Sequence, residues 1–592
     1  MRTLTRRLLS AIRQRYRDDM HAGSGVIGKG FATYADWVSR YSTIGPAQRR
    51  RLIEAQQKCG TLSTVTVLVD AQGASREQIA LSLRSIREQT YVRWDIVVVN
   101  PPDDSRVLDR AQAVAVYRNK QNSGVSLKEL LDVASGAVIV PMVAGDLLSP
   151  AALTAFVLAF DAWPNATALY ADEDRVDASG HRSDPWFKGA WSPDQLLAQA
   201  YTLRACAFRR GTVLEASQRN LALDSVMEAA YAIWLSMAAD DDAKIHHLPF
   251  VLYHRRRDAS QVEPHAFVKL AQESLLAHKY GFHVRTDNET DFGWRRVVWP
   301  TPLPPQRISL CVPTRDRHRL LSNCVEGLRH RTHWQDLEII IVDNGSVEAE
   351  THAYLDSLAV DARVTVLRDD GEFNFSRLNN LGARAATGAV FGLINNDLEV
   401  KEPGWLREMV SHAVRPDVGA VGALLHYGND TVQHAGVVLG IGGIASHVHK
   451  GLPDGLTGYN GRVVIAQDVS CVTAACLLTR LEIYQRLGGL DEQRLPVAYN
   501  DVDFCLRVRA AGLRVIYTPH AHLYHLESAS RGLDSGGAKR ARLEQDKAAM
   551  RDRWSKQIAD DPFYSPNLSN TATDCRLAFP PRVVFPWGRL GN

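Results

Sequence analysis

The sequence predicts an α/β protein built from two tandem domains with mainly parallel central sheets. Two long segments repeat one order of features: an apolar strand, an amphipathic helix, a second apolar strand, and a later strand that follows a small residue and Gly. Each segment also ends in Leu-Tyr-His, at Leu252–His254 and at Leu523–His525. A repeat of this length indicates a duplicated domain. Strands that alternate with helices predict βαβ units and a parallel sheet.

The strands of the two segments can be matched one by one. The first strands are "STVTVLVDA" and "QRISLCVPT", and the later strands are "ASGAVIVPMVAGD" and "ATGAVFGLINND", which end at Asp146 and Asp397. In the second segment, Leu337 to Asp343 lies between these two strands. It forms a continuous apolar run, which suits a strand buried on both faces. We therefore expect both domains to present residues at the carboxyl ends of parallel strands.

Composition divides the chain into five parts. We expect a helical lead-in at residues 1–60, a first domain at 61–298 and a second domain at 308–535. Residues 299–307, "WPTPLPPQR", contain four prolines, which is typical of a linker. Residues 536–592 are expected to form a C-terminal helix and a tail.

The composition also excludes some classes of protein. The 592 residues are too many for one hydrophobic core, and the formal net charge of +3 argues against nucleic acid as a partner. None of the eight cysteines form a Cys-x-x-Cys pair, which argues against a zinc site or a disulfide framework. A reducing, cytoplasmic location is expected.

The N-terminus leaves two interpretations open. "MRTLTRRLLSAIRQRYR" is basic with interleaved Leu and Ile, and it lacks the long apolar core of a signal peptide. It is either an interfacial helix that contacts anionic lipid or a solvated helix or frayed end. The first interpretation predicts peripheral contact with the inner face of the plasma membrane. The sequence contains no run of eighteen apolar residues, so no membrane-spanning segment is predicted.

Acidic residues follow two buried strands of the second domain. Asp343 and Asp397 end such strands and should face one crevice, because ligands of these sheets bind beyond the carboxyl ends. Carboxylates suit Mg²⁺ or Mn²⁺, although Asp343 also fits a simple turn cap. Asp501 and Asp503 begin a helix in "AYNDVDFCLRVRAAG", where helix capping is the alternative. His525 fits a ligand or a structural histidine.

The order of these motifs is more specific than any one of them. The stretches "VPTRDR", "IIIVDNGS", "RLNNLGARAATGAV", "NNDLEV", "VQHAGVVLGIGG", "YNDVDFCLRVRAAG" and "LYHLESASRG" follow one another from Ile308 to about Gly532. This segment resembles the inverting family-two glycosyltransferases of the GT-A fold, nearest to the bacterial rhamnosyltransferase-like and O-antigen or capsule assembly members. Residues from about Val65 to Arg256 resemble the same fold.

The resemblance implies a donor site for a UDP-, dTDP- or GDP-linked sugar. Its implied donor-binding residues are Pro313, Thr314, Arg315, Asp343, Asn380, Asn396 and Asp397. The first three would line the base and ribose, Asp343 would hold the edge of the base, and the two asparagines would lie beside the ribose and diphosphate.

The resemblance also implies the reacting groups. Asp397 and His525 would bind the divalent metal, Mn²⁺ or Mg²⁺. Asp501 would be the general base that takes the proton of the acceptor hydroxyl, and Asp503 would face the acceptor. The acceptor would be a glycan or a lipid-linked oligosaccharide in bacterial surface polysaccharide synthesis.

The first domain keeps fewer of these residues. Val143–Asp146 retains one carboxylate, and "SVMEAAYAIW" has Glu228 as its only acid where the base motif would begin a helix. His254 remains, and "ADEDRVD" carries an acidic cluster that imitates an Asp-x-Asp motif. We expect a degenerate domain. The alternatives are a bifunctional transferase with two active domains and a non-catalytic glycan-binding or assembly scaffold.

Overall fold

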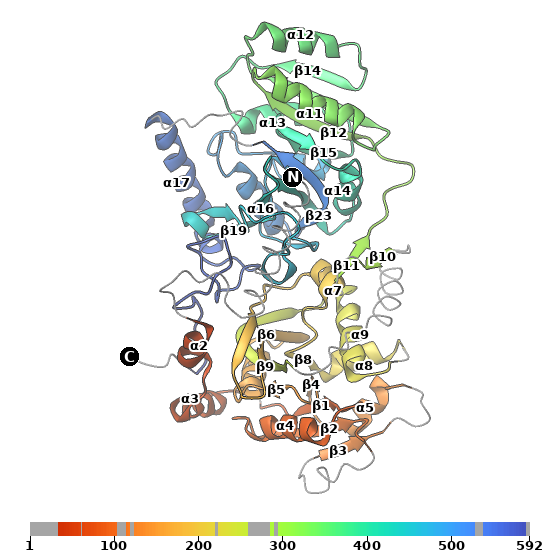
Figure 1. The fold of residues 1–592 in the computed structure, drawn as a ribbon, viewed down its shortest axis with the longest axis vertical. Helices are drawn as coiled ribbons and strands as arrows, with labels where there is room; N and C mark the ends of the chain where they lie inside the picture. Colours follow the sequence, from red (N-terminus) through yellow and green to blue (C-terminus); the bar gives the residue numbers. More distant parts are fainter. Residues whose placement is uncertain are drawn as a thin grey trace, which may run out of the picture. The chain divides into compact units, whose positions relative to one another are not determined.

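The structure is a computed structural model. It describes residues 33–60, 62–102, 114–118, 124–219, 223–257, 285–288, 294–526 and 537–587. These residues fall into two compact units (Figure 1). The first unit runs to Arg295 and also takes in Tyr564–Ser569 and the chain from Arg576 on. The second unit is Arg296–Phe563 with Asn570–Cys575.

The first unit is a mixed sheet flanked by helices. Its sheet order is β3-β2-β1-β4-β8-β6-β9-β5, with β7 paired to β6. The elements are α2 (Tyr34–Trp37), η1 (Val38–Ser42), α3 (Pro46–Gln57), β1 (Val65–Asp70), α4 (Arg76–Arg87), β2 (Trp94–Val99), β3 (Val114–Tyr117), α5 (Leu127–Val133), β4 (Val138–Val143), β5 (Leu147–Leu148), α6 (Ala152–Ala162), β6 (Ala168–Val176), β7 (Arg182–Trp186), α7 (Pro193–Gln199), β8 (Cys206–Arg209), α8 (Arg210–Ser217), α9 (Val226–Ala238), β9 (Ile245–Arg256) and β10 (Arg285–Asn288).

The second unit repeats this plan after β11 (Arg295–Val298). Its sheet order is β14-β13-β12-β15-β22-β17-β23-β16. The elements are β12 (Ile308–Thr314), α11 (His318–His330), β13 (Leu337–Asp343), α12 (Ala349–Leu358), β14 (Val364–Arg368), α13 (Phe375–Ala385), β15 (Val390–Ile394), β16 (Leu398–Val400), α14 (Trp405–Ala413), β17 (Val418–His426), β18 (Val432–His434), β19 (Val437–Leu439), η2 (Ile441–Gly443), β20 (Ala445–His447), η3 (Tyr459–Gly461), β21 (Gln467–Asp468), β22 (Cys476–Arg480), α15 (Leu481–Arg486), α16 (Asn500–Ala510), β23 (Arg514–His525) and α17 (Gly537–Ala559).

The predicted duplication and α/β class are confirmed, because the two sheet orders match strand for strand when β12 is set against β1. The first four strands of each sheet pair in parallel, and the remaining strands bring in antiparallel pairs. In each unit one arginine of the fifth strand in the order closes the end of a helix. Arg209 donates to carbonyls in the last turn of α6 and just beyond it, and Arg480 donates to carbonyls at the end of α14.

The small residue and Gly before β4 and β15 have a physical reason. A Cβ at Gly136 would lie 2.4 Å from the Thr66 backbone nitrogen, and one at Gly388 would lie 2.7 Å from the Ser309 nitrogen. Each glycine instead donates its N–H to the hydroxyl of that Thr or Ser at 2.8 Å. The central strand and the incoming chain are therefore too close for any side chain there.

The proline-rich segment and the tail are both anchored by aromatic side chains. Trp299 is buried in the second unit, with the Arg415 guanidinium 4.1 Å from its ring centre. Tyr564, Phe585 and Trp587 are buried in the first unit, and the Trp587 indole donates to the Tyr41 carbonyl. The tail thus contributes to the first unit's core.

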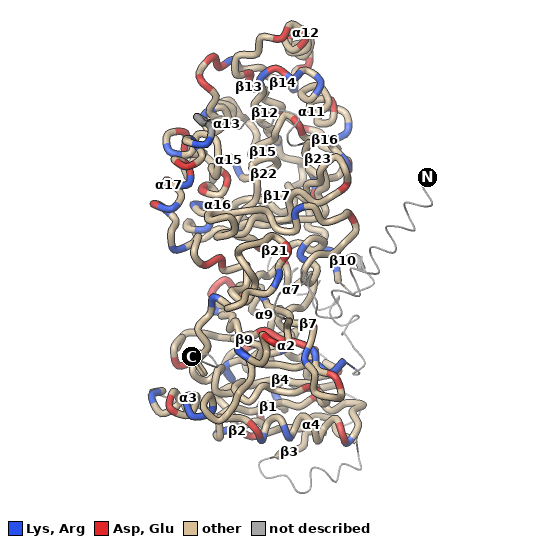
Figure 2. Tube along the Cα trace, turned by 60° about the vertical axis from the view of Figure 1, so that its left-hand side comes forward, with Lys and Arg blue, Asp and Glu red and all other residues tan. Residues whose placement is uncertain are grey.

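The charges are mixed along the chain. In Figure 2, basic and acidic positions are interspersed over the described parts of both units. Among the described helices, none combines the length and the apolar character needed to cross a bilayer. The basic N-terminal segment, which the sequence leaves as either an interfacial helix or a solvated helix or frayed end, lies outside the described residues.

Candidate functional site

Three of the predicted donor-site residues meet where β12, β13 and β15 end. Thr314 is the register partner of Asp343, because β12 and β13 pair in parallel. Asn396 follows β15, and its amide donates to the Thr314 hydroxyl at 2.9 Å. Pro313 is buried within β12, whereas Arg315 is exposed just beyond it. The carboxyl ends of parallel strands therefore bring these residues together, as the sheet geometry predicts.

The Asp343 carboxylate is held rigidly. Its Oδ1 accepts hydrogen bonds from the Ser346 N–H at 3.0 Å and the Ser346 hydroxyl at 2.5 Å, which is the turn-cap arrangement. Its Oδ2 forms an ion pair with Arg368, whose side chain is 42% exposed. Arg368 reaches in from solvent to Asp343 Oδ2, the outer oxygen of the carboxylate. A ligand can therefore approach this oxygen by displacing the Arg368 side chain.

The loop after β12 is strained and tied to the loop after β13. Asp316 and Arg317 both have positive φ, at 54° and 60°, which is uncommon for residues other than glycine. The Asp316 carboxylate accepts the N–H groups of Val347 and Glu348 at 2.7 and 2.9 Å. Asp316 is part of the "VPTRDR" stretch, but no local pattern in the sequence marks it as the residue that ties the two loops together. These bonds fix the backbone on which Arg315 stands.

Asp397 and His525 come into direct contact. His525 Nε2 lies 3.1 Å from Asp397 Oδ1, and both side chains are buried. The contact follows from the antiparallel pairing of β16 with β23, which sets Leu398 opposite His525. The Leu526 N–H also donates to the Asp397 carbonyl at 3.0 Å. Two residues predicted as metal ligands are thus neighbours at the edge of the sheet.

Two amides surround the His525 ring. The Asn395 amide nitrogen is 3.2 Å from Nε2, and the Gln433 amide places its nitrogen at 2.7 Å and its oxygen at 3.0 Å from Nδ1. Gln433, on β18, is only 3% exposed. Within the described part of the chain, the buried Asn395 Oδ1 has no hydrogen-bond partner. Gln433 lies in the "VQHAGVVLGIGG" stretch, where no local pattern in the sequence marks it as a partner of His525.

The donor set fits a divalent ion that takes its other ligands from a substrate. Two ligands bound about 2.1 Å from one ion at a right angle lie about 3.0 Å apart, close to the Asp397–His525 separation. Within the described residues, no three His, Cys, Asp or Glu side chains are grouped so that they could hold a metal. Phosphate oxygens of a nucleoside diphosphate would have to complete the coordination shell.

Asp501 lies in the first turn of α16 with its carboxylate fixed by backbone donors. Oδ2 accepts the Ala474 N–H at 3.0 Å and Oδ1 accepts the Val502 N–H at 2.8 Å. Burial raises the pKa of the Asp501 carboxyl, and these two N–H groups act in the opposite direction. Ala475 follows Ala474 in the chain, and its carbonyl accepts the Asn395 N–H at 2.9 Å. A two-residue segment therefore connects Asp501 to the end of β15.

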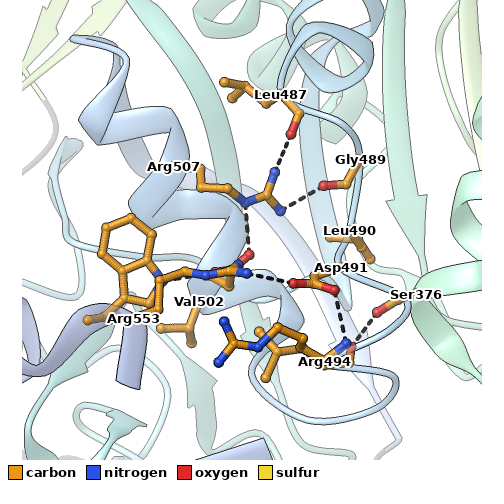
Figure 3. Close-up of polar contacts among 12 residues, drawn as sticks. Ser376, Leu487, Gly489, Leu490, Asp491, Arg494, Val502, Arg507 and Arg553 are labelled. Atoms are coloured by element: carbon orange, nitrogen blue, oxygen red, sulfur yellow. Dashed lines mark hydrogen bonds and ion pairs between the residues drawn. The ribbon is translucent and has the colours of Figure 1, made fainter. Parts of the chain in front are cut away.

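Asp503 does not have the predicted place on the acceptor side. Its side chain is fully buried and accepts hydrogen bonds from Arg507 at 2.8 Å, Arg553 at 2.7 Å and the Trp554 indole at 2.8 Å. Arg553 also binds Asp491 at 2.8 Å (Figure 3). Residues two apart on a helix point in different directions. Asp501 and Asp503 therefore have different surroundings, and Asp503 fastens α17 to α16.

Asn380, predicted to lie beside the ribose and diphosphate, is the second predicted site residue whose side chain has other partners. Its amide nitrogen donates to the Leu490 carbonyl at 2.8 Å and to Glu492 at 3.3 Å. Its oxygen accepts from the Tyr484 hydroxyl at 2.7 Å and the Leu490 N–H at 3.0 Å. These four bonds use the full capacity of a side-chain amide. Asn380 thus holds the loop after α15, with no capacity left for a ribose or a diphosphate.

Comparison with known proteins identifies a family for part of the second unit. Residues 309–488 match the family described as Glycosyl transferase family 2. Asp501 and His525 lie beyond the matched segment.

Two relatives cover most of this chain. An uncharacterized protein, y4gI, of Sinorhizobium fredii (strain NBRC 101917 / NGR234) is 36% identical over 595 residues, which is 96% of this chain and 64% of that protein. The O-antigen biosynthesis protein RfbC of Myxococcus xanthus is 33% identical over 563 residues, which is 92% of this chain and 43% of that protein. The chain therefore spans less than two thirds of the length of either relative.

A solved mannosyltransferase, PcManGT from Pyrobaculum calidifontis in complex with GDP-Man and Mn²⁺, aligns with 45% of this chain and 70% of its own. The TM-score is 0.33 and the sequence identity is 17%. Similarity at this level assigns neither a ligand nor a reaction to the present chain.

Proposed function

We propose that the chain is a metal-dependent inverting glycosyltransferase, because residues 309–488 match the family described as Glycosyl transferase family 2. It moves a sugar from a nucleotide-sugar donor to a glycan or lipid-linked glycan acceptor. The observation that carries this proposal is the arrangement at the end of β15. There, Ala474 and Ala475 connect the Asp501 carboxylate to the strand that leads into Asp397.

The donor lies across the carboxyl ends of β12, β13 and β15. Thr314 and Asn396 form the floor beside the diphosphate, and Asp343 offers its outer oxygen to the base or ribose. Pro313 and Arg315 border this region along β12. Arg315, which is exposed and positively charged, is suited to contact the donor's anionic groups.

Asp397 and His525 would hold a divalent ion from one side of the site, where it would offset the negative charge that grows on the departing nucleoside diphosphate. The Asp397 carboxylate supplies a hard oxygen, and the Asn395 amide nitrogen lies 3.2 Å from His525 Nε2. Mn²⁺ and Mg²⁺ both suit this mixture of oxygen ligands and one imidazole.

Asp501 takes the proton from the attacking hydroxyl of the acceptor. Its burial raises its pKa, which makes the ionised carboxylate a stronger base than an exposed aspartate. The Ala474 and Val502 N–H groups hold the carboxylate in one orientation. Inversion in one displacement needs no second, nucleophilic carboxylate, in contrast to retention through a covalent intermediate.

The biological setting that we propose is bacterial surface polysaccharide synthesis at the cytoplasmic face of the membrane. The support is the 33% identity with a protein named for O-antigen biosynthesis, over 92% of the present chain. The basic N-terminal segment would supply contact with anionic lipid.

The test measures binding before turnover. Calorimetry with Mn²⁺ and UDP, GDP or dTDP should give metal-linked binding of one nucleotide by the wild type and none by Asp397→Ala. A donor screen that follows release of the nucleoside diphosphate then identifies the sugar. A chain that binds no nucleotide with or without metal is the glycan-binding or assembly scaffold of the alternative hypothesis.

A further inference from the structure

The two units are copies of one sheet, so their residues can be compared position by position. In the first unit β4 pairs with β8 so that Val138 lies opposite Arg209. In the second unit β15 pairs with β22 so that Val390 lies opposite Arg480. Counting five residues back from these two arginines gives Arg204, just before β8, and Ala475, just before β22. By this count an arginine stands in one copy where the other has an alanine.

Asp146 is the counterpart of Asp397. Each aspartate lies one residue before the edge-strand pair, which is Leu147 opposite His254 in the first unit and Leu398 opposite His525 in the second. The partners of the two carboxylates differ. Asp397 faces His525 at 3.1 Å, whereas Asp146 forms an ion pair with Arg204 at 3.1 Å.

Both oxygens of the Asp146 carboxylate are engaged by groups of its own unit. Oδ2 accepts the Tyr253 hydroxyl at 2.7 Å beside the Arg204 guanidinium, and Oδ1 accepts the Arg256 N–H at 3.0 Å. The Asp146 and Arg204 side chains are 4% and 12% exposed. The guanidinium is thus a cation that the chain itself supplies at the place where the second unit offers a carboxylate to a metal.

His254, the counterpart of His525, also has a different partner. Its Nδ1 lies 2.6 Å from Asp174, and the same carboxylate binds Arg182 at 2.6 Å and the Tyr34 hydroxyl at 2.7 Å. In the second unit, an uncharged amide, that of Gln433, takes the Nδ1 side of the ring. At these two positions the first unit therefore offers neither a carboxylate that faces a metal nor a histidine held by a neutral partner.

The acidic cluster after "PNATALY" does not replace the lost site. Asp172 binds His247 at 2.7 Å, Glu173 binds Lys188 at 2.9 Å, and Asp174 is engaged as described above. The nucleotide side is changed as well. Because Thr66 and Ser309 are equivalent, Ala71 and Asn100 stand where the second unit has Thr314 and Asp343.

We propose that Arg204 is a resident cation that takes the place of the divalent ion at Asp146. The residue at this position, Arg204 in one copy and Ala475 in the other, decides which unit binds a metal–nucleotide complex. A fixed guanidinium both neutralises the carboxylate and repels a dication at short range, so the first unit binds none. This inference rests on the metal-dependent function proposed for the second unit.

The first experiment counts bound metal on the full chain. With Mn²⁺ and whichever of UDP, GDP or dTDP binds, calorimetry and electron paramagnetic resonance should give one Mn²⁺ per wild-type chain. Asp397→Ala should reduce the count to zero, and Asp146→Asn should leave it at one. Two Mn²⁺ per chain, or a site lost with Asp146→Asn, would overturn the inference. A wild type that binds no Mn²⁺ with any nucleotide would instead overturn the proposed function.

The second experiment moves the cation. Ala475→Arg should weaken Mn²⁺ binding by 100-fold or more, and Ala475→Met, which adds comparable length without charge, should weaken it by less than 10-fold. Equal losses in the two variants would mean that bulk, and not charge, closes the site, which contradicts the inference. Where Ala475→Arg fails to fold in a melting experiment, the metal count with Asp146→Asn still decides.

Discussion

Asp397 and His525 lie 3.1 Å apart because the short strand β16 pairs with the end of β23, which sets Leu398 opposite His525. The proposed metal side of the site is therefore built by an edge-strand pair, and it depends on β23 reaching the sheet edge in this register. The proposed general base, Asp501, lies separately on the first turn of α16. Metal binding and proton transfer should accordingly be separable by substitution.

Replacing His525 tests the metal half of the site. His525→Ala should lower Mn²⁺ affinity in the presence of nucleotide by about 10- to 100-fold, because one of two protein ligands is lost. Isothermal titration of Mn²⁺ measures it. The control is His181→Ala, at an exposed histidine of the first unit, which should leave the Mn²⁺ affinity unchanged. An unchanged affinity in His525→Ala would remove His525 from the metal site.

Gln433 should act through His525. Gln433→Leu removes the amide that holds His525 Nδ1 and should weaken Mn²⁺ binding by about 10-fold or more. Gln433→Glu keeps a hydrogen-bond acceptor beside Nδ1 and should retain the Mn²⁺ affinity. Melting temperatures without metal separate this effect from general loosening of β18. The role is contradicted if both variants bind Mn²⁺ like the wild type.

Asp501 should control the pH dependence of transfer. The base works only when ionised, and burial raises its pKa, so kcat should fall as the pH drops through a value above the ordinary aspartate pKa of about 3.9. Asp501→Asn should lower kcat by about 100-fold or more and leave Mn²⁺–nucleotide affinity intact. Initial rates across pH, with binding measured in parallel, check both statements. Near-normal turnover of this variant would assign the base elsewhere.

Asp503 should matter for stability. Asp503→Asn leaves Arg507 and Arg553 without their shared carboxylate, and the loss should reduce the free energy of unfolding by about 2–4 kcal/mol. Urea denaturation followed by tryptophan fluorescence measures it. Asp552→Ala removes an exposed ion pair with Arg494 and should cost less than about 0.5 kcal/mol. A lowered kcat with unchanged stability would instead return Asp503 to the acceptor side.

Much of the fold could be predicted because its signals are local. Apolar runs such as Leu337–Asp343 identify buried strands, and the Gly at positions 136 and 388 marks where two strands approach too closely for a side chain. The repeat then indicates two copies of one sheet. Since parallel strands share an edge for their carboxyl ends, Thr314, Asp343 and Asn396 were predictable as neighbours.

Side-chain partners were decided by the tertiary structure. Asp503 and Asn380 suit a ligand in the sequence, but their hydrogen bonds go to α17 and to the loop after α15. Arg204 is unremarkable in the sequence until β8 places it beside Asp146. Such contacts join segments far apart along the chain, so no local pattern encodes them. The sequence by itself therefore determined two copies of one α/β fold and the strand ends that carry the acids, and the tertiary structure decided which acids remain open to a ligand.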